Sequence, residues 1–293
     1  MEYVQFVLAP QMINGLAIGI AVVLMALGLT IIFGLLDVIN MAHGEFYALG
    51  AFLGLTFASL GLGFWALCLV VPLAMLPIGY AVERTLIQTV FHHRDRHILT
   101  LLLTFGLALI LEDAYKIIYG PNPLRPPLPV TGGTEVFEIF MPNYRLLLIG
   151  LGAAVITGVW LLVYRTSLGA MVRAAAFDKD MAGSLGVPVK TIYSATFAFG
   201  CALAGLAGVL LAPIYSVFPT MGRDFILLAF TVVIVGGMGS IKGAVVAGIV
   251  LAQIQSIASL YVSPVWSEPI VFGIMVVVLM IRPQGLFGRL GNA

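Results

Sequence analysis

Four polar residues stand close together between two long apolar stretches of the sequence. They are Asp37, Asn40, His43 and Glu45. Polar groups set among apolar residues at membrane depth are costly, and they usually face a cavity or a partner. We therefore predict that these four residues gate or brace a pathway for a polar solute. The alternative is a plain cytoplasmic turn between the first two helices.

Recognisable enzyme signatures are missing from the sequence. It has no His-Glu-x-x-His, no Gly-x-Ser-x-Gly and no phosphate-binding loop. We predict no catalytic residues, so ATP-driven work would need an ATPase on another chain. We also predict no metal site, because arginines surround the histidines at 92, 93 and 97 and no thiol is near. An intramembrane enzyme remains as an alternative, with His43 and Glu45 as its best candidates.

The stretch 165–190 predicts a short cytoplasmic helix. Ser167 can cap its start, the run 174–176 is alanine, and Gly186 followed by Pro188 can end it. The helix would expose apolar groups among charged ones, which favours docking to another protein over lying on lipid headgroups. The predicted docking residues are Arg173, Ala174, Phe177, Asp178, Met181 and Gly186.

A glycine-rich stretch near the C-terminal end predicts close packing of helices. It contains Gly236, Gly237, Gly239 and Gly243. Small residues recur four apart at Gly239, Gly243 and Ala247, which on a helix makes one smooth face.

The amino-acid composition indicates the class of protein in which these residues lie. Of 293 residues, 61% are hydrophobic and 9% are charged, against roughly 45–50% and 25% in soluble domains. This excludes a soluble enzyme and a nucleic-acid binder, and it indicates an all-α polytopic membrane protein. The net charge of +1 implies no bulk electrostatic attraction to an acidic partner. The two cysteines, both in apolar runs, predict no disulfide.

Apolar runs predict eight or nine transmembrane helices in a single domain over residues 1–293. The first run has no basic residue before it and is expected to be retained. The run at 224–241 is marginal and could be re-entrant. The expected spans are 7–34, 44–60, 64–82, 98–118, 145–164, 191–213, 224–241, 244–262 and 268–282.

The basic residues predict the orientation. Ten of the 14 fall on the side of the loops 83–97 and 165–190 and of the C-terminal tail. That side should be cytoplasmic, which puts the C-terminus inside and the N-terminus outside. The proline-rich outer loop, 119–144, is either a docking surface for a soluble partner or a stiff connector.

A short internal echo indicates inverted repeats. Residues 34–37 read Gly-Leu-Leu-Asp and residues 222–224 read Gly-Arg-Asp, and each is followed by a helix rich in small residues. With the predicted orientation they lie on opposite sides of the membrane, as in an inverted repeat with its binding site near the midplane.

The stretches 39–45, 173–187 and 236–240 together resemble the permeases of branched-chain amino-acid ABC transporters. They read Ile-Asn-Met-Ala-His-Gly-Glu, Arg-Ala-Ala-Ala ending in Leu-Gly-Val, and Gly-Gly-Met-Gly-Ser. The likeness is to the shorter of the two permease subunits and covers nearly the whole chain. The one departure is Met41, where many members carry Phe.

The resemblance implies a type II ABC-importer-like fold and import of branched-chain amino acids across a bacterial or archaeal cytoplasmic membrane. It also implies a second homologous permease, two ATPase subunits that hold ATP and Mg, and a periplasmic or lipid-anchored binding protein. The 165–190 helix would then be the coupling helix seated in an ATPase. This chain itself would carry no cofactor. Open alternatives are a permease for urea or short amides, and a self-contained channel or carrier.

Overall fold

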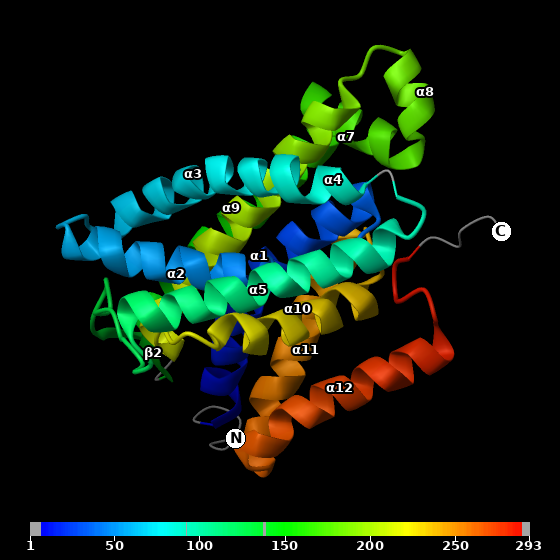
Figure 1. Ribbon diagram of the computed structural model, residues 1–293. Coiled ribbons are helices and arrows are strands. Elements are labelled where there is room, and N and C mark those ends of the chain that lie inside the picture. The colour runs from blue at the N-terminus through cyan, green and yellow to red at the C-terminus, as the bar shows by residue number, and fades with distance from the viewer. Residues whose placement is uncertain (1–6, 92, 137–138, 289–293) are drawn as a thin grey trace.

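The computed structural model of the protein describes residues 7–91, 93–136 and 139–288. Helices make up almost all of the regular structure in these ranges, as Figure 1 shows. In chain order the elements are α1 (Ala9–Leu36), α2 (His43–Ser59), α3 (Phe64–Val82), the π-helical turn η2 (Glu83–Ile87), α4 (Gln88–Val90), α5 (Arg96–Tyr119), β1 (Gly133–Val136), β2 (Ile139–Pro142), α6 (Asn143–Arg165), α7 (Ser167–Phe177), α8 (Lys179–Ser184), α9 (Val189–Tyr215), α10 (Met221–Gly236), α11 (Ile241–Tyr261) and α12 (Pro264–Ile281).

Six helices in the described residues are long and apolar enough to cross a membrane. They are α1, α5, α6, α9, α11 and the continuous stretch Phe64–Val90 that joins α3, η2 and α4. The prediction of an all-α membrane protein that crosses the bilayer several times is confirmed. The other predicted spans correspond to α2, α10 and α12, which have 17, 16 and 18 residues.

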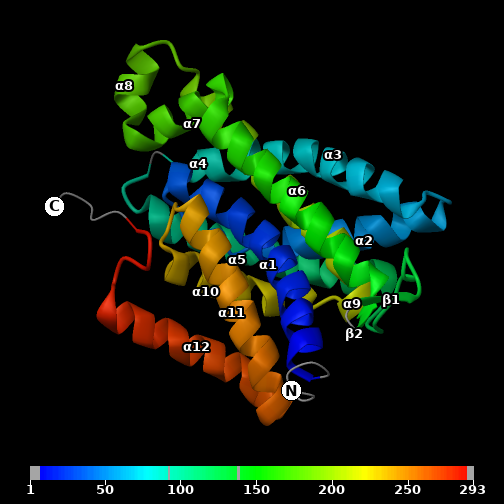
Figure 2. The same cartoon turned by 180° about the vertical axis from the view of Figure 1, so that it is seen from behind.

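Two of these helices form the centre of the molecule. In the most apolar 18-residue part of α1, 83% of the residues are buried, and in the corresponding part of α9 the share is 89%. α1 packs against α9, α11 and α6, and α9 packs against α3 and α2. The outer helices, which surround α1 and α9 in Figure 2, instead expose large apolar side chains, which suits contact with lipid. The hydrophobic core is therefore formed by the packing of the surrounding helices on α1 and α9.

Each central helix is followed by a non-glycine residue with positive φ, after which the chain turns back into the bundle. Asp37 after α1 has φ 50°, and Ser216 after α9 has φ 68°. They are the only non-glycine residues with positive φ in the part of the chain that is described. A short connection follows each of them, and then a short helix begins, α2 after α1 and α10 after α9. The same order of elements therefore occurs twice in the molecule: a long helix, a residue with positive φ and a short helix.

The loops gather at two opposite ends of the molecule. Figures 1 and 2 show α4, α7, α8 and the C-terminal segment at one end, and the turn between α2 and α3 with β1 and β2 at the other. β1 and β2 form an antiparallel hairpin in which Gly133 pairs with Pro142. The all-α prediction missed this hairpin, which lies in the predicted outer loop 119–144. A short turn joins α2 and α3, between the spans predicted at 44–60 and 64–82, and its Gly61 has φ 91°.

Candidate functional site

The polar residues before and within the first turn of α2 are buried inside the helical bundle. Asn40 and His43 are 0% exposed and Glu45 is 2% exposed. Asn40 Oδ1 accepts a hydrogen bond of 3.0 Å from the Ala42 backbone N–H. The neighbouring backbone N–H of Met41 donates to Thr104 Oγ1 of α5 at 3.1 Å. The connection between α1 and α2 is therefore tied down inside the protein, and it is not a solvated turn.

His43 fixes the start of α2 against the middle of α1. Its Nε2 lies 3.1 Å from the carbonyl oxygen of Met25 and donates to it. Met25 precedes the end of α1 at Leu36 by 11 residues, which is about 17 Å along a helix. The imidazole also lies against Gly28, where an added Cβ would come 3.0 Å from His43 Cε1 and 2.6 Å from the Gly200 carbonyl oxygen. α2 therefore starts deep in the bundle, wedged between α1 and α9.

Glu45 brings α2 against the first turn of α10. Its carboxylate packs on Gly222, where an added Cβ would lie 2.6 Å from Glu45 Cδ. Glu45 Oε2 has no hydrogen-bond partner among the residues described. Nearby on α5, Glu112 pairs with Arg223 at 3.2 Å and with Lys116 at 2.8 Å. With Asp224 in the first turn of α10, three carboxylates and two cations thus lie around the point where α2, α5 and α10 meet.

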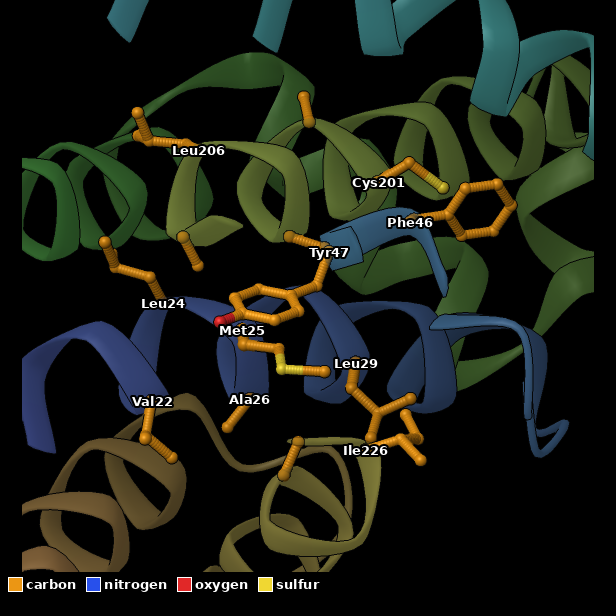
Figure 3. Close-up of a cluster of buried hydrophobic side chains, with 14 of the residues drawn as sticks. Val22, Leu24, Met25, Ala26, Leu29, Phe46, Tyr47, Cys201, Leu206 and Ile226 are labelled. Atoms are coloured by element: carbon orange, nitrogen blue, oxygen red, sulfur yellow. The ribbon is translucent and has the colours of Figure 1, made fainter. Parts of the chain in front are cut away.

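Glycines allow the backbone of α2 to touch its neighbours directly. A Cβ at Gly44 would collide with the Gly222 carbonyl oxygen of α10, and a Cβ at Gly50 would collide with Gly205 of α9. The Tyr115 hydroxyl of α5 donates to the Glu45 carbonyl oxygen at 2.9 Å. In Figure 3 the Tyr47 side chain lies over Leu24 and Met25 of α1, with Phe46 and Cys201 toward α9. The first turn of α2 is in contact with α1, α5, α9 and α10.

The structure brings together three of the four predicted pathway residues and leaves the fourth apart. The Asp37 side chain is 67% exposed and faces Arg96 at 3.8 Å. Asn40, His43 and Glu45 lie at the buried start of α2. Sequence reasoning missed the residues that enclose them, which are Gly28, Thr104, Tyr115, Gly200 and Gly222. Their only signal was glycine or a polar side chain in an apolar helix.

The predicted docking helix is two helices. α7 and α8 meet at Asp178, whose Oδ1 caps α8 by accepting from the backbone N–H groups of Asp180 at 3.0 Å and Met181 at 2.9 Å. The prediction that Ser167 caps the first helix is wrong by one residue. Thr166 Oγ1 accepts from the Gly169 N–H at 3.1 Å, and Ser167 is the first helical residue. Gly186, at φ 86°, follows α8 as the predicted stop.

The α7–α8 segment presents apolar side chains on its surface. Phe177, Met181 and Leu185 are 86%, 61% and 80% exposed. Arg173 and Ala174 are also exposed, but Arg173 Nη1 donates to the Val163 carbonyl oxygen of α6, and its guanidinium lies 5.6 Å from the Tyr164 ring centroid. Arg173 therefore holds α7 to the end of α6, and the exposed apolar groups lie further along the segment.

The glycine-rich stretch packs closely, but only part of it is helical. Gly237 and Gly239 have φ of 101° and 80° and form the turn between α10 and α11, so the smooth helix face predicted from the spacing of Gly239 is wrong. Gly236 and Gly243 lie backbone to backbone across this turn, and Gly239 lies on Gly34 of α1. This turn joins the ends of α1, α10 and α11.

No group of three or more His, Cys, Asp or Glu in the described ranges could hold a metal ion. Of the histidines considered for a metal, His92 lies outside those ranges.

Comparisons with known proteins all lead to one family of membrane permeases. A family model described as "Branched-chain amino acid transport system / permease component" matches residues 11–280. A Pseudomonas aeruginosa protein, the high-affinity branched-chain amino acid transport system permease protein BraD, is 31% identical, with 95% of each chain covered. The Escherichia coli K12 permease protein LivH of a system with the same description is 28% identical, again with 95% of each chain covered. The E. coli K12 permease protein LivM is also 28% identical, over 90% of this chain and 67% of that protein.

Proposed function

The chain belongs to the branched-chain amino acid permease family, and from this premise we propose that it is the membrane-spanning permease subunit of an ATP-driven importer of branched-chain amino acids in a cytoplasmic membrane. The observation that carries the proposal is the match over residues 11–280, together with relatives whose names state this substrate. The buried polar start of α2 supports it, because polar groups inside a membrane bundle mark a solute pathway. The chain performs no bond chemistry.

We propose that two inverted repeats build the pathway. The first comprises α1, α2 and α3, and the second comprises α9, α10 and α11. The support is the shared order of a long buried helix, a residue with positive φ (Asp37 or Ser216), a short helix and a further helix. This pairing replaces the one suggested by the sequence echo, because Gly222 lies in α10 and corresponds in place to the first turn of α2. The N-terminus is then outside and the C-terminus inside, and α2 and α10 each cross only part of the membrane.

The meeting point of α2 and α10 is the proposed gate. Both helices begin there, and Gly44 touches Gly222 without a side chain between them. Discontinuous helices that start inside the membrane are the usual place of a transporter's solute site. Asn40, His43 and Glu45 brace the gate from the α2 side. Their burial indicates that the junction is closed in this structure.

The α7–α8 segment is the proposed ATPase docking site, called the coupling segment from here on. It carries Phe177 and Met181 exposed on a helical pair at the predicted cytoplasmic end. Two ATPase subunits would hold ATP and Mg, and a second homologous permease would complete the complex. The relatives LivH and LivM, both permease proteins of a high-affinity branched-chain amino acid transport system, support the second permease. A substrate-binding protein outside would meet the loop 119–144.

Changing Phe177 to Glu tests the docking proposal. Phe177 is 86% exposed, so a charge there should leave membrane insertion intact while removing an apolar anchor. We expect the ATPase subunits to be lost when the complex is purified through the permease. A matched control is Phe287→Glu, at an aromatic residue that is 47% exposed in the C-terminal segment, outside the coupling segment, and this variant is expected to keep the ATPase subunits. Full ATPase retention and normal transport by Phe177→Glu would contradict the docking assignment.

Proteoliposomes with one component omitted at a time test the function. We expect uptake of labelled leucine only when the permeases, the ATPases, ATP and the binding protein are all present. Uptake by this chain alone would favour a self-contained channel or carrier. Transport of urea or short amides in place of leucine would place the chain with permeases for those solutes.

A further inference from the structure

We propose that Glu83 is a positioning residue for transport, which connects the coupling segment to the seam between α3 and α9. This proposal rests on the proposed function, because it needs the coupling segment to receive movement from an ATPase. Glu83 lies in the π-helical turn η2, where the stretch Phe64–Val90 changes from α3 to α4. π-Helical turns within α-helices occur frequently at functional sites.

Glu83 is completely buried, and it forms no ion pair with the residues that the structure describes. Its Oε2 accepts from Ser194 Oγ of α9 and, at 3.2 Å, from Gln88 Nε2. Its Oε1 has no hydrogen-bond partner among the described residues. The neighbouring cation, Arg84, donates instead to Gln88 Oε1 at 3.1 Å. A buried carboxylate with an unfilled acceptor is expensive for stability alone, which favours a role in transport.

The Ser194 hydroxyl has two alternative acceptors and a single proton. One acceptor is Glu83 Oε2 on η2, and the other is the carbonyl oxygen of Lys190, 3.1 Å away on the preceding turn of α9. Donation to Glu83 joins η2 to α9. Donation to Lys190 leaves Ser194 joined to the neighbouring stretch only through the hydrogen bond that its Oγ accepts from Gln88 Nε2 at 3.3 Å. Rotation of the Ser194 hydroxyl can therefore exchange one acceptor for the other, and an element that switches during transport requires such a pair of alternatives.

This contact is the last of a row along the seam between α3 and α9. One turn earlier, Gly79 lies on Ala198, where an added Cβ would come 2.8 Å from the Ala198 Cα. One turn before that, Met75 packs on Gly205. The first two contacts are apolar and tight, and the contact of Glu83 is polar. A change at Ser194 is thus placed to shift α3 along α9 as a rigid unit.

Phe91 connects the same place to the coupling segment. The Lys179 ammonium of α8 lies 5.7 Å from the Phe91 ring centroid, and the Phe91 and Tyr193 rings are 5.4 Å apart. Tyr193 directly precedes Ser194. A hollow of ≈ 880 Å³ lies beside these residues and is lined by Gln88, Phe91, Lys179, Lys190 and Tyr193 among others. A continuous series of contacts therefore connects α8 to Glu83. The hollow beside it leaves space for these side chains to move.

The test uses the whole complex in proteoliposomes and measures leucine imported per ATP hydrolysed. Ser194→Ala removes the hydrogen-bond donor. Glu83→Leu removes the acceptor and replaces it with an apolar side chain of similar length. We expect each to lower the ratio about tenfold, the scale of one lost hydrogen bond to a charged group. Glu83→Gln keeps an oxygen acceptor and is expected to retain coupling. Thr85→Val is the matched control, because the exposed Thr85 hydroxyl bonds only within its own helix, to the Ala81 carbonyl oxygen.

ATPase retention on the purified permease separates this role from docking and from folding. We expect Ser194→Ala and Glu83→Leu to retain the ATPase subunits that Phe177→Glu loses. A wild-type ratio of leucine to ATP in Ser194→Ala would overturn the proposal, and so would loss of the ATPase subunits from both variants, since that would make the role structural. If Glu83→Leu fails to assemble, Ser194→Ala decides alone. Failure of the docking proposal shows separately, as ATPase retained on Phe177→Glu.

Discussion

Replacing Gly44 by alanine places one methyl group in the contact between α2 and α10. The new Cβ would meet the Gly222 carbonyl oxygen and would lie 2.8 Å from the Ile226 Cβ. Carbon atoms in ordinary contact are about 3.5–4.0 Å apart, so the two helices must separate by about 1 Å. Neither obstacle is the free end of a flexible side chain. Overpacking of this kind costs about 1–3 kcal/mol, which is roughly 5–150-fold in an equilibrium constant.

This strain acts only while α2 and α10 touch, so it disfavours the closed gate. ATP-driven leucine uptake by proteoliposomes holding the full complex should therefore fall by about 5–150-fold. Gly54→Ala is the matched control on the same helix, since its Cβ would meet only the Val209 Cγ2, a methyl group that can give way, at 3.3 Å. Equal uptake by the two variants, at equal yields of complex, would refute the reasoning. A lower yield of the Gly44→Ala complex alone would point to folding and not to gating.

Two further predictions concern local anchors. His43→Ala removes the hydrogen bond to the Met25 carbonyl oxygen and leaves a cavity, so we expect the free energy of unfolding to fall by about 3 kcal/mol; thermal unfolding of the purified complex measures this, and an unchanged transition would contradict it. Thr166→Ala should cost about 1 kcal/mol of helix stability by removing the cap on the Gly169 N–H, whereas Ser167→Ala should cost less. Faster amide hydrogen exchange in the first turn of α7 for the first variant alone is the expected result, and the reverse order would return the cap to Ser167.

The sequence was sufficient for the features that depend on local chemistry. Apolar runs located five of the six long apolar helices to within a few residues, whereas the stretch predicted at 64–82 continues to Val90. The polar stretch before α2 was recognised because Asn40, His43 and Glu45 are costly in an apolar setting. These inferences compare a residue only with its neighbours in the chain.

The sequence alone does not predict how deep in the bundle a helix starts, or which residues far apart in the chain are in contact. Hydropathy alone does not tell a complete span from a helix that starts inside the bundle, so the nature of α2 became clear only from the contact of His43 with Met25. The spacing of Gly239 and Gly243 fits a helix as well as a turn, and the backbone angle of Gly239 decides for the turn. The partner of Glu83 is Ser194, more than a hundred positions later in the chain, and periodicity gives no access to such pairs.

The most direct test of the account is whether the junction of α2 and α10 moves during transport. Spin labels at Ile39 and Leu227, which are 41% and 49% exposed and flank the junction, would report the distance in complexes whose Cys68 and Cys201 are replaced by alanine. We predict different distance distributions in the nucleotide-free complex and in the complex trapped during ATP hydrolysis. One unchanged, narrow distribution in both, from a complex that still transports leucine, would contradict the proposal that these helices form the gate.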